Sequence, residues 1–473
     1  MVEGKQQAMY PWSDSLNSWA EGTRLKIDAL GLVTMLGAAE MDESIGRLVA
    51  SPWLQFLPLL GAFVVAGDQF TERRPGGTLY SISAGMTTTE TAGWFSRWVK
   101  TQGFETVRTR IRWEVGQRPP RWNTLLIGFL VFGLPLNGML IALTVLSGDW
   151  WGFANALSMT ASIPVKLLLV HLNCRAIDAN IEQAERALPR LIAEFERELA
   201  VFQTETEAYE AEMARRRDQA GPQSTPPPLP PVRPVNPNGP AKLLLVTVDS
   251  RAISMRVEEY LVRNIFPADP GIRHQRLYSA ASYLGWAAFA VHVLSLGMAA
   301  MPAQIFTILL LIIPTILTRF QVGCEDFRIG KTEVPRSCWI TSRLKATVSK
   351  FPPEDGQWVC EGDVEESSVT VLGEEGDGDH QQSQHKQEAR KTDVEFNAGN
   401  VVPAAQPLPK PKVSRRRQDL YVWLEPTKEE EESMKAWDLM PRNPHWLKKY
   451  EIKKEEHFRR RARQQANSVI QTW

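Results

Sequence analysis

The sequence predicts an all-α membrane protein with four transmembrane helices, a candidate fifth, a long cytoplasmic amphipathic helix and disordered segments. Uncharged apolar runs of spanning length alternate with densely charged, proline-rich or acidic ones. The mean hydropathy of −0.24 and the balance of 54 basic against 54 acidic residues conceal this uneven distribution. Sixteen tryptophans point the same way, because tryptophan favours bilayer interfaces. The proline-rich and disordered parts are typical of a eukaryotic chain.

The N-terminal segment, residues 1–47, lacks the basic-then-apolar form of a signal peptide. Residues 48–67 follow and are uncharged over a spanning length, but three residues interrupt them: Pro52, Gln55 and Pro58. This run therefore either crosses the bilayer or forms a re-entrant or interfacial helix.

The next stretch, residues 68–121, is basic and rich in aromatic residues. Aromatic and basic residues alternate most densely over 91–112. A helix of this kind can lie in the headgroup layer of an anionic leaflet, so we expect an interfacial helix there.

Four runs have the length and apolar character of transmembrane helices, which need about 20 residues to cross the bilayer core. The second contains a single charge, Lys166. The last two come from one uncharged stretch that is too long for a single span and is broken at Gly297 and Pro302. The four predicted spans are 122–148, 150–173, 279–299 and 303–322.

Lysine and arginine near the span ends predict the orientation of the chain in the bilayer. Five arginines precede the first span, Arg175 follows the second, and Arg319 ends the fourth. The loops around Asp149 and 299–301 carry no lysine or arginine. We therefore expect the bulk of the chain and its C-terminus on the cytoplasmic side, whereas the side of the N-terminus depends on 48–67.

Polar residues inside the spans are functional candidates because burying them costs free energy. One hypothesis is a polar pathway for a substrate or proton. The favoured one is helix packing, in which small and polar residues hydrogen-bond between neighbouring helices. Lys166 is close enough to the cytoplasmic end to extend to the interface. The candidates are Asn137, Asn155, Ser158, Ser162, Lys166 and His292.

Residues 174–219 are predicted to continue the second span as a cytoplasmic amphipathic helix. Apolar residues recur along it at alternating spacings of three and four, as in a coiled coil. Pairing of two copies through 174–218 and packing against the protein's own cytoplasmic part explain this stripe equally well.

A proline-rich linker, residues 220–241, comes next, and we expect 242–276 to fold back after it. The linker contains a PxxPxR string, which resembles a ligand of SH3 domains through Pro228, Pro231 and Arg233. An SH3-domain protein is therefore one predicted partner, and a semi-rigid spacer is the alternative.

Three segments follow the fourth span. Residues 323–362 retain apolar character, 363–413 form an acidic and polar linker predicted to be disordered, and 414–473 form a charged, tryptophan-containing tail. The basic end of this tail, over 453–463, is predicted to be a solvated charged helix.

The sequence contains no catalytic motif, no cofactor motif and no cysteine–histidine spacing suited to a metal. The zero net charge argues against nucleic acid as a partner. Cys174 and Cys324 lie at cytoplasmic span ends, where S-palmitoylation occurs, although an inert half-buried thiol is the favoured interpretation of each. We expect a non-enzymatic membrane-anchored scaffold or adaptor, with a channel or transporter as the alternative.

Overall fold

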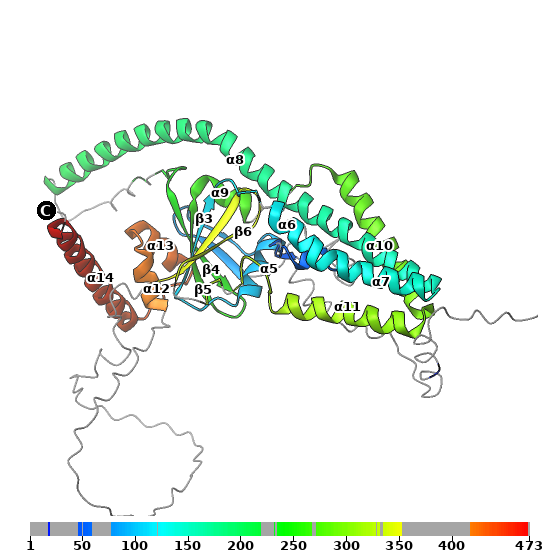
Figure 1. The fold of residues 1–473 in the computed structure, drawn as a ribbon. Helices are drawn as coiled ribbons and strands as arrows, with labels where there is room; N and C mark the ends of the chain where they lie inside the picture. Colours follow the sequence, from blue (N-terminus) through cyan, green and yellow to red (C-terminus); the bar gives the residue numbers. More distant parts are fainter. Residues whose placement is uncertain are drawn as a thin grey trace, which may run out of the picture. The chain divides into compact units, whose positions relative to one another are not determined.

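The computed structural model describes residues 18, 46–49, 51–58, 77–120, 122–218, 231, 234–266, 271–327, 329–331, 334–351 and 417–471. These residues form long apolar helices, a seven-stranded sheet and a C-terminal group of helices (Figure 1). The predicted all-α fold is therefore wrong. Long apolar helices are conspicuous in a sequence, whereas the pairing of short strands depends on partners from distant segments.

The four predicted spans are confirmed as helices that are long and apolar enough to cross a membrane, by length and composition. The first is formed by α6 (Trp122–Gly128), the π-helical η2 (Phe129–Gly133) and α7 (Leu134–Leu146). The others are the first part of α8 (Trp150–Asp218), α10 (Gln275–Met298) and α11 (Met301–Arg319). Residues from α7, α8, α10 and α11 share one apolar core, which includes Leu140, Met159, Leu296 and Leu310.

The π-helical turn η2 lies immediately before Pro135. Proline has no N–H to donate along the helix, so the preceding turn loses an α-helical hydrogen bond. The π turn is a local accommodation of this loss.

The seven strands form one mixed sheet in the order β2-β1-β4-β5-β3-β7-β6, in which only the β3–β5 pair is parallel. Its strands come from three parts of the chain that the apolar helices separate. The first part provides three strands, the connection between α8 and α10 provides two, and the segment after α11 provides two. They are β1 (Gly77–Ser81), β2 (Met86–Thr88), β3 (Thr109–Val115), β4 (Pro240–Thr247), β5 (Ala252–Glu258), β6 (Arg336–Trp339) and β7 (Leu344–Lys350).

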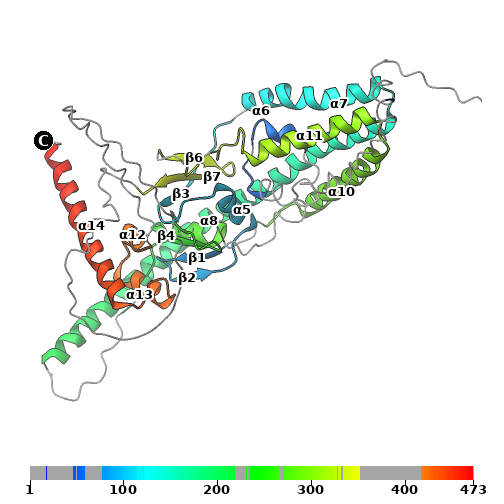
Figure 2. The same ribbon diagram turned by 90° about the horizontal axis from the view of Figure 1, so that it is seen from below.

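One face of the sheet packs against α5 (Gly93–Gln102), α9 (Glu259–Ile265) and the middle of α8. Alternate residues of each strand point to this face, so β4 contributes Leu243 and Leu245 while Lys242 and Leu244 belong to the other face. Figure 2 shows α5 and the sheet from below. We call this apolar side the inner face.

The expectation of an interfacial helix over 91–112 is wrong, because the aromatic residues of this segment belong to the core. Trp94, Phe95 and Trp98 of α5 are at most 1 % exposed and surround Trp113 of β3 at ring-centroid distances of 5.3–6.0 Å. Their aromatic rings fill the inner core of the sheet domain and are not available to lipid headgroups.

The helices α12 (Arg417–Leu424), α13 (Lys428–Ala436) and α14 (Pro444–Gln471) form a group that we call the C-terminal module. Helices α12 and α13 contact the outer face of the sheet, and α14 packs against α12. Trp437 packs on Tyr80 of β1, and Trp423 stacks on Phe351 with ring centroids 4.9 Å apart. Apolar and aromatic contacts thus hold the module against the sheet.

Part of the candidate fifth span is described and contains only the short 3-10 helix η1 (Leu54–Phe56), whereas residues 59–67 lie outside the described part. This segment approaches α6 closely, since a Cβ on Gly128 would lie 2.0 Å from the Pro52 carbonyl oxygen. The predicted disordered linker 363–413 and most of the proline-rich linker, including Pro228 and Arg233, also lie outside the described residues; Pro231 alone of the SH3-like residues is described.

Candidate functional site

The candidate polar residues of the spans separate into two groups. The first group joins three helices: His292 Nδ1 of α10 and Asn155 Oδ1 of α8 are 2.5 Å apart, and Asn155 Nδ2 donates to Thr307 Oγ1 of α11 at 2.8 Å. All three side chains have 0 % exposure. Because an amide oxygen only accepts, this arrangement places the His292 proton on Nδ1. His292 Nε2 has no hydrogen-bond partner among the described residues.

The second group holds the segment at 51–58. Asn137 Nδ2 donates to the Phe56 carbonyl oxygen at 3.2 Å, and Lys166 Nζ donates to the Leu57 carbonyl oxygen at 3.0 Å. Lys166 is 7 % exposed, so the expectation that it extends to the interface is wrong. Two polar side chains from different spans therefore satisfy consecutive backbone carbonyls of one short segment.

The serine candidates bond to their own helix. Ser158 Oγ donates to the Asn155 carbonyl oxygen at 2.8 Å, and Ser162 Oγ donates to the Met159 carbonyl oxygen at 2.5 Å. Hydroxyl groups in apolar helices commonly satisfy themselves in this way. The polar candidates of α8, at positions 155, 158, 162 and 166, therefore do not form a row of free polar groups.

A buried polar cluster that sequence reasoning missed lies between the N-terminal segment and the chain after α11. Arg47 Nη2 donates to Cys324 Sγ at 2.8 Å, and Gln102 Nε2 donates to Asp326 Oδ2 at 2.5 Å. Arg47 Nε lies 3.7 Å from the same carboxylate oxygen. Burial raises the pKa of Asp326, although the Arg47 charge opposes this shift. No local motif marks these residues, because three separate segments bring them together.

The two candidate palmitoylation sites have structural partners. Burial raises the pKa of the Cys324 thiol to about 11, and its side chain is 7 % exposed. Cys174 Sγ lies 3.8 Å from the Ile340 carbonyl oxygen and packs against the inner core. Low exposure and hydrogen bonding favour the interpretation of both residues as structural thiols.

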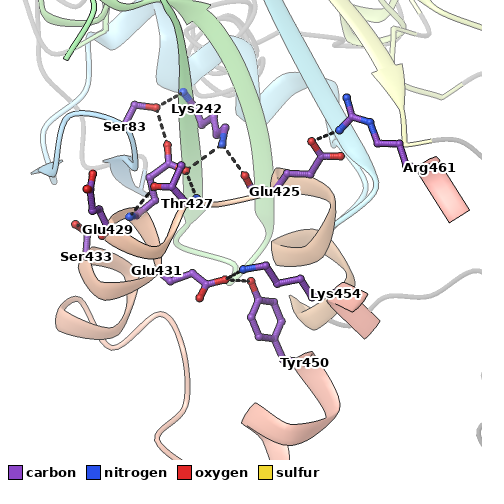
Figure 3. Close-up of polar contacts among 11 residues, drawn as sticks. Ser83, Lys242, Glu425, Thr427, Glu429, Glu431, Ser433, Tyr450, Lys454 and Arg461 are labelled. Atoms are coloured by element: carbon purple, nitrogen blue, oxygen red, sulfur yellow. Dashed lines mark hydrogen bonds and ion pairs between the residues drawn. The ribbon is translucent and has the colours of Figure 1, made fainter. Parts of the chain in front are cut away.

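Polar contacts around Lys242 also join the C-terminal module to the outer face (Figure 3). Lys242 Nζ of β4 lies 2.9 Å from Glu430 Oε2 and donates to the Glu425 carbonyl oxygen at 2.7 Å. Ser83 Oγ donates to Glu430 Oε1 at 3.2 Å. Glu430 also completes a capping box with Thr427, so the residue that caps the first turn of α13 also binds the sheet.

Ion pairs also join the helices within the module. Glu431 accepts from Tyr450 Oη at 2.8 Å and pairs with Lys454, while Glu425 pairs with Arg461 and lies 3.0 Å from His457 Nε2. Burial raises the pKa of Glu425, but the hydrogen bonds from His457 and Arg461 outweigh it and give a net lowering. Part of the basic end of the chain is therefore paired and packed, in contrast to the expected solvated helix.

Beyond the sheet domain, α8 continues as an arm, which we define as residues 185–216. The last α8 residue in the inner core is Ala184, and none of the arm residues, all of which the structure describes, is buried. The predicted amphipathic helix of 174–218 is thus packed in its first turns and solvent-facing afterwards.

Among the residues that the structure describes, no group of three or more His, Cys, Asp or Glu side chains is arranged to hold a metal ion. Comparisons of the chain with protein-family models, with curated proteins and with solved structures gave no match. The functional argument therefore depends on the geometry of this chain alone.

Proposed function

We propose that the chain is a non-enzymatic, membrane-anchored scaffold, with its sheet domain and arm on the cytoplasmic side. The observation that carries this proposal is that three separate segments of the chain contribute strands to one sheet. Its three contributing segments are separated by the α6–α8 hairpin and by the α10–α11 hairpin. Strands that hydrogen-bond in one sheet lie on one side of a bilayer, so each hairpin enters the membrane and returns.

The ends of the two hairpins that lie away from the sheet domain support this topology, because they contact each other. Asp149, between α7 and α8, accepts from the Ala300 amide between α10 and α11 at 2.7 Å. The loop residues there include no lysine or arginine, whereas arginines flank the other ends of the spans. The excess of positive charge beside the sheet domain favours the cytoplasmic side for it.

Helix α8 supports a scaffold role because it belongs to three parts of the molecule. Its first part is one of the apolar spans, its middle provides Leu172, Ile177 and Ile181 to the inner core, and its last part is the arm. The helix is uninterrupted from the anchor to the arm, with Pro189 at the start of the arm as a place where it can bend.

The polar residues of the spans support an anchoring role more than transport. Asn155, His292 and Thr307 satisfy one another between helices, as polar residues do in packed transmembrane bundles. One observation favours the alternative of a channel or transporter, namely the buried and unpartnered Nε2 of His292.

The scaffold proposal is tested on the full chain extracted in mild detergent. Phe195→Asp with Phe202→Asp places two charges on the apolar stripe of the arm. Ala193→Asp with Ala200→Asp places the same charges on exposed positions of the same helix away from the stripe. We expect the stripe variant alone to lose the high-mass complexes that native electrophoresis detects. Identical complexes in all three proteins, or none in any of them, would refute the arm as a scaffold surface.

The transport alternative has a separate test. His292→Ala is compared with the unchanged chain in proteoliposomes, by ion and pH-indicator flux. The scaffold proposal predicts no flux in either protein above that of empty vesicles. A flux that His292→Ala abolishes, while the variant keeps its folded elution profile, would favour transport.

A further inference from the structure

We infer that the arm binds a basic amphipathic helix of a partner protein, and that two copies of the arm do not pair with each other. This inference depends on the proposed scaffold function and gives its partner a defined chemistry. It is carried by the apolar stripe of the arm together with the charge of its two flanks.

The stripe has the spacing of a coiled-coil seam. Its residues recur at alternating intervals of four and three, which keeps them on one side of a helix that winds around another. From Leu188 to Tyr209 the stripe residues are half-buried, whereas the residues between them are exposed; Met213 is itself 38 % exposed, and none of the stripe residues is buried. The stripe consists of Leu188, Ile192, Phe195, Leu199, Phe202, Thr206, Tyr209 and Met213.

The residues beside this seam are acidic. In heptad terms, the stripe residues occupy the a and d positions, and the adjoining e and g positions contain five glutamates and no basic residue. They are Glu196, Glu198, Glu205, Glu210 and Glu212, with Pro189, Leu191 and Gln203 at the remaining flanking positions. From 194 to 212 the arm carries seven glutamates against one arginine.

Two copies of such a helix repel each other in either direction. In a parallel pair, each g position faces an e position of the other helix, so Glu205 meets Glu210. In an antiparallel pair, g faces g and e faces e, so glutamates again meet glutamates. Like charges at neighbouring positions destabilise helices, whereas opposite charges stabilise them. The apolar seam therefore favours helix pairing, and its flanks select lysine and arginine in the partner.

The acidic flanks also exclude the other common ligands of an exposed amphipathic helix. An anionic membrane surface attracts basic helices and repels this one. The required partner is thus a helix with an apolar stripe at the same spacing and basic residues on both flanks, over the roughly 38 Å that 25 helical residues span. Part of α14 in a second copy has a suitable charge, but Lys453, Lys454 and Arg461 of that helix are already paired within the module.

Two designed helical peptides test this inference with the purified full chain in detergent. Both peptides carry leucine and isoleucine at seam positions, and one has lysine and the other glutamate on the flanks. We expect fluorescence anisotropy to show that the lysine peptide binds at least tenfold more tightly than the glutamate peptide. Equal affinity for the two peptides, or binding of neither, would overturn the inference.

Charge reversal locates the binding site. Glu198→Lys with Glu205→Lys reverses two flanking charges. We expect it to lower the affinity for the lysine peptide by about tenfold and to raise the affinity for the glutamate peptide. The matched control, Glu194→Lys with Glu207→Lys, reverses two exposed charges away from the seam and should change either affinity by less than about threefold. An equal loss in both variants would show attraction to net charge alone and would contradict the seam.

Analytical ultracentrifugation of the unchanged chain tests whether the arm binds the arm of a second copy instead. Self-association that Phe195→Asp with Phe202→Asp abolishes would show pairing of two arms and overturn the inference. Binding of a peptide of residues 444–471 at the arm would support the inferred chemistry and would identify α14 of a second copy as one source. If the peptides fail while the high-mass complexes still depend on the stripe, the basic-helix inference is refuted and the scaffold role stands.

Discussion

Lys242 joins the outer face of the sheet to the C-terminal module. It lies on the outer face of β4, where its ammonium group binds Glu430 and the Glu425 carbonyl oxygen. The side chains of Lys242 and Glu430 are only 21 % and 12 % exposed. Partial burial strengthens this pair relative to a surface pair, and removal of one partner leaves the other charge without compensation.

Lys242→Met should therefore loosen the C-terminal module. A hydrogen bond to a charged group contributes about 1.5–3 kcal/mol, so the free energy of local opening should fall by that amount. Hydrogen exchange of the α13 amides measures it. Arg442→Met is the control, because its pair with Asp438 is 82 % and 75 % exposed and should contribute about 0–0.5 kcal/mol. Equal exchange in both variants would contradict the anchoring role of Lys242.

Glu425 predicts how the packing of the module depends on pH. Its pKa is lowered in the folded chain from the ordinary value of 4.5, so its contribution to stability is fully present above that value. The contribution is lost as the pH falls through the lowered pKa. We expect the α12–α14 contact to weaken in acid, and Glu425→Gln to remove this dependence. The measurement is tryptophan fluorescence across pH 3 to 7, and an unchanged acid transition in the variant would contradict this assignment.

At the scale of elements, the first span is shaped by close approach of the backbone. A Cβ at Gly128 would lie 2.0 Å from the Pro52 carbonyl oxygen, and one at Gly133 would lie 2.8 Å from Phe56 Cβ. Asn137 then bonds the Phe56 carbonyl oxygen. Small residues at these two positions allow the segment at 51–58 to pack directly on the span.

Gly128→Ala should consequently separate this segment from α6. Overpacking of a close contact costs about 1–3 kcal/mol, so we expect a lower thermal midpoint in detergent. Gly138→Ala is a matched control in the same span, since a Cβ there meets nothing within 4 Å. Its midpoint should stay the same or rise slightly, because alanine is the better helix former. A similar loss in both variants would show a general intolerance of the span to larger residues.

The sequence predicted the four spans because each is a long apolar run with at most one charged residue, a signal that is local. It did not predict the sheet, although β3 and β7 both alternate apolar and polar residues, as Ile111, Trp113 and Val115 show. The start of β3 was included in the interfacial helix expected over 91–112, so the strand was not predicted. Pairing of β3 with β5 and β7 depends on long-range contacts, which no single segment encodes.

The candidate site was predictable to a similar extent. Asn155 and His292 stand out as polar residues in apolar runs, and the structure brings them together. Thr307 and Arg47 do not stand out, because threonine is common in membrane helices and Arg47 precedes the first predicted span. Their roles arise only from the packing of separate segments.

At the scale of the whole molecule, the sheet and the spans constrain each other. Three segments that contribute to one sheet are joined through two apolar hairpins, so the sheet can form only if both hairpins return to the side from which they started. In the topology that we propose, the arm of α8, which precedes β4 in the chain, lies on that side as well. Anchor, sheet domain and arm are therefore parts of one topology.

Site-directed labelling in sealed membranes tests this central claim most directly. Single cysteines replace Ser250 in the β4–β5 turn, Glu207 in the arm and Asp419 in α12, and a fourth replaces Trp150 at the other end of the spans, in a chain without its native cysteines. An impermeant maleimide should label the first three from the cytoplasmic side only and the cysteine at 150 from the opposite side only. Labelling of Ser250→Cys and Glu207→Cys from different sides, or of all four from one side, would contradict the two-hairpin topology and the scaffold built on it.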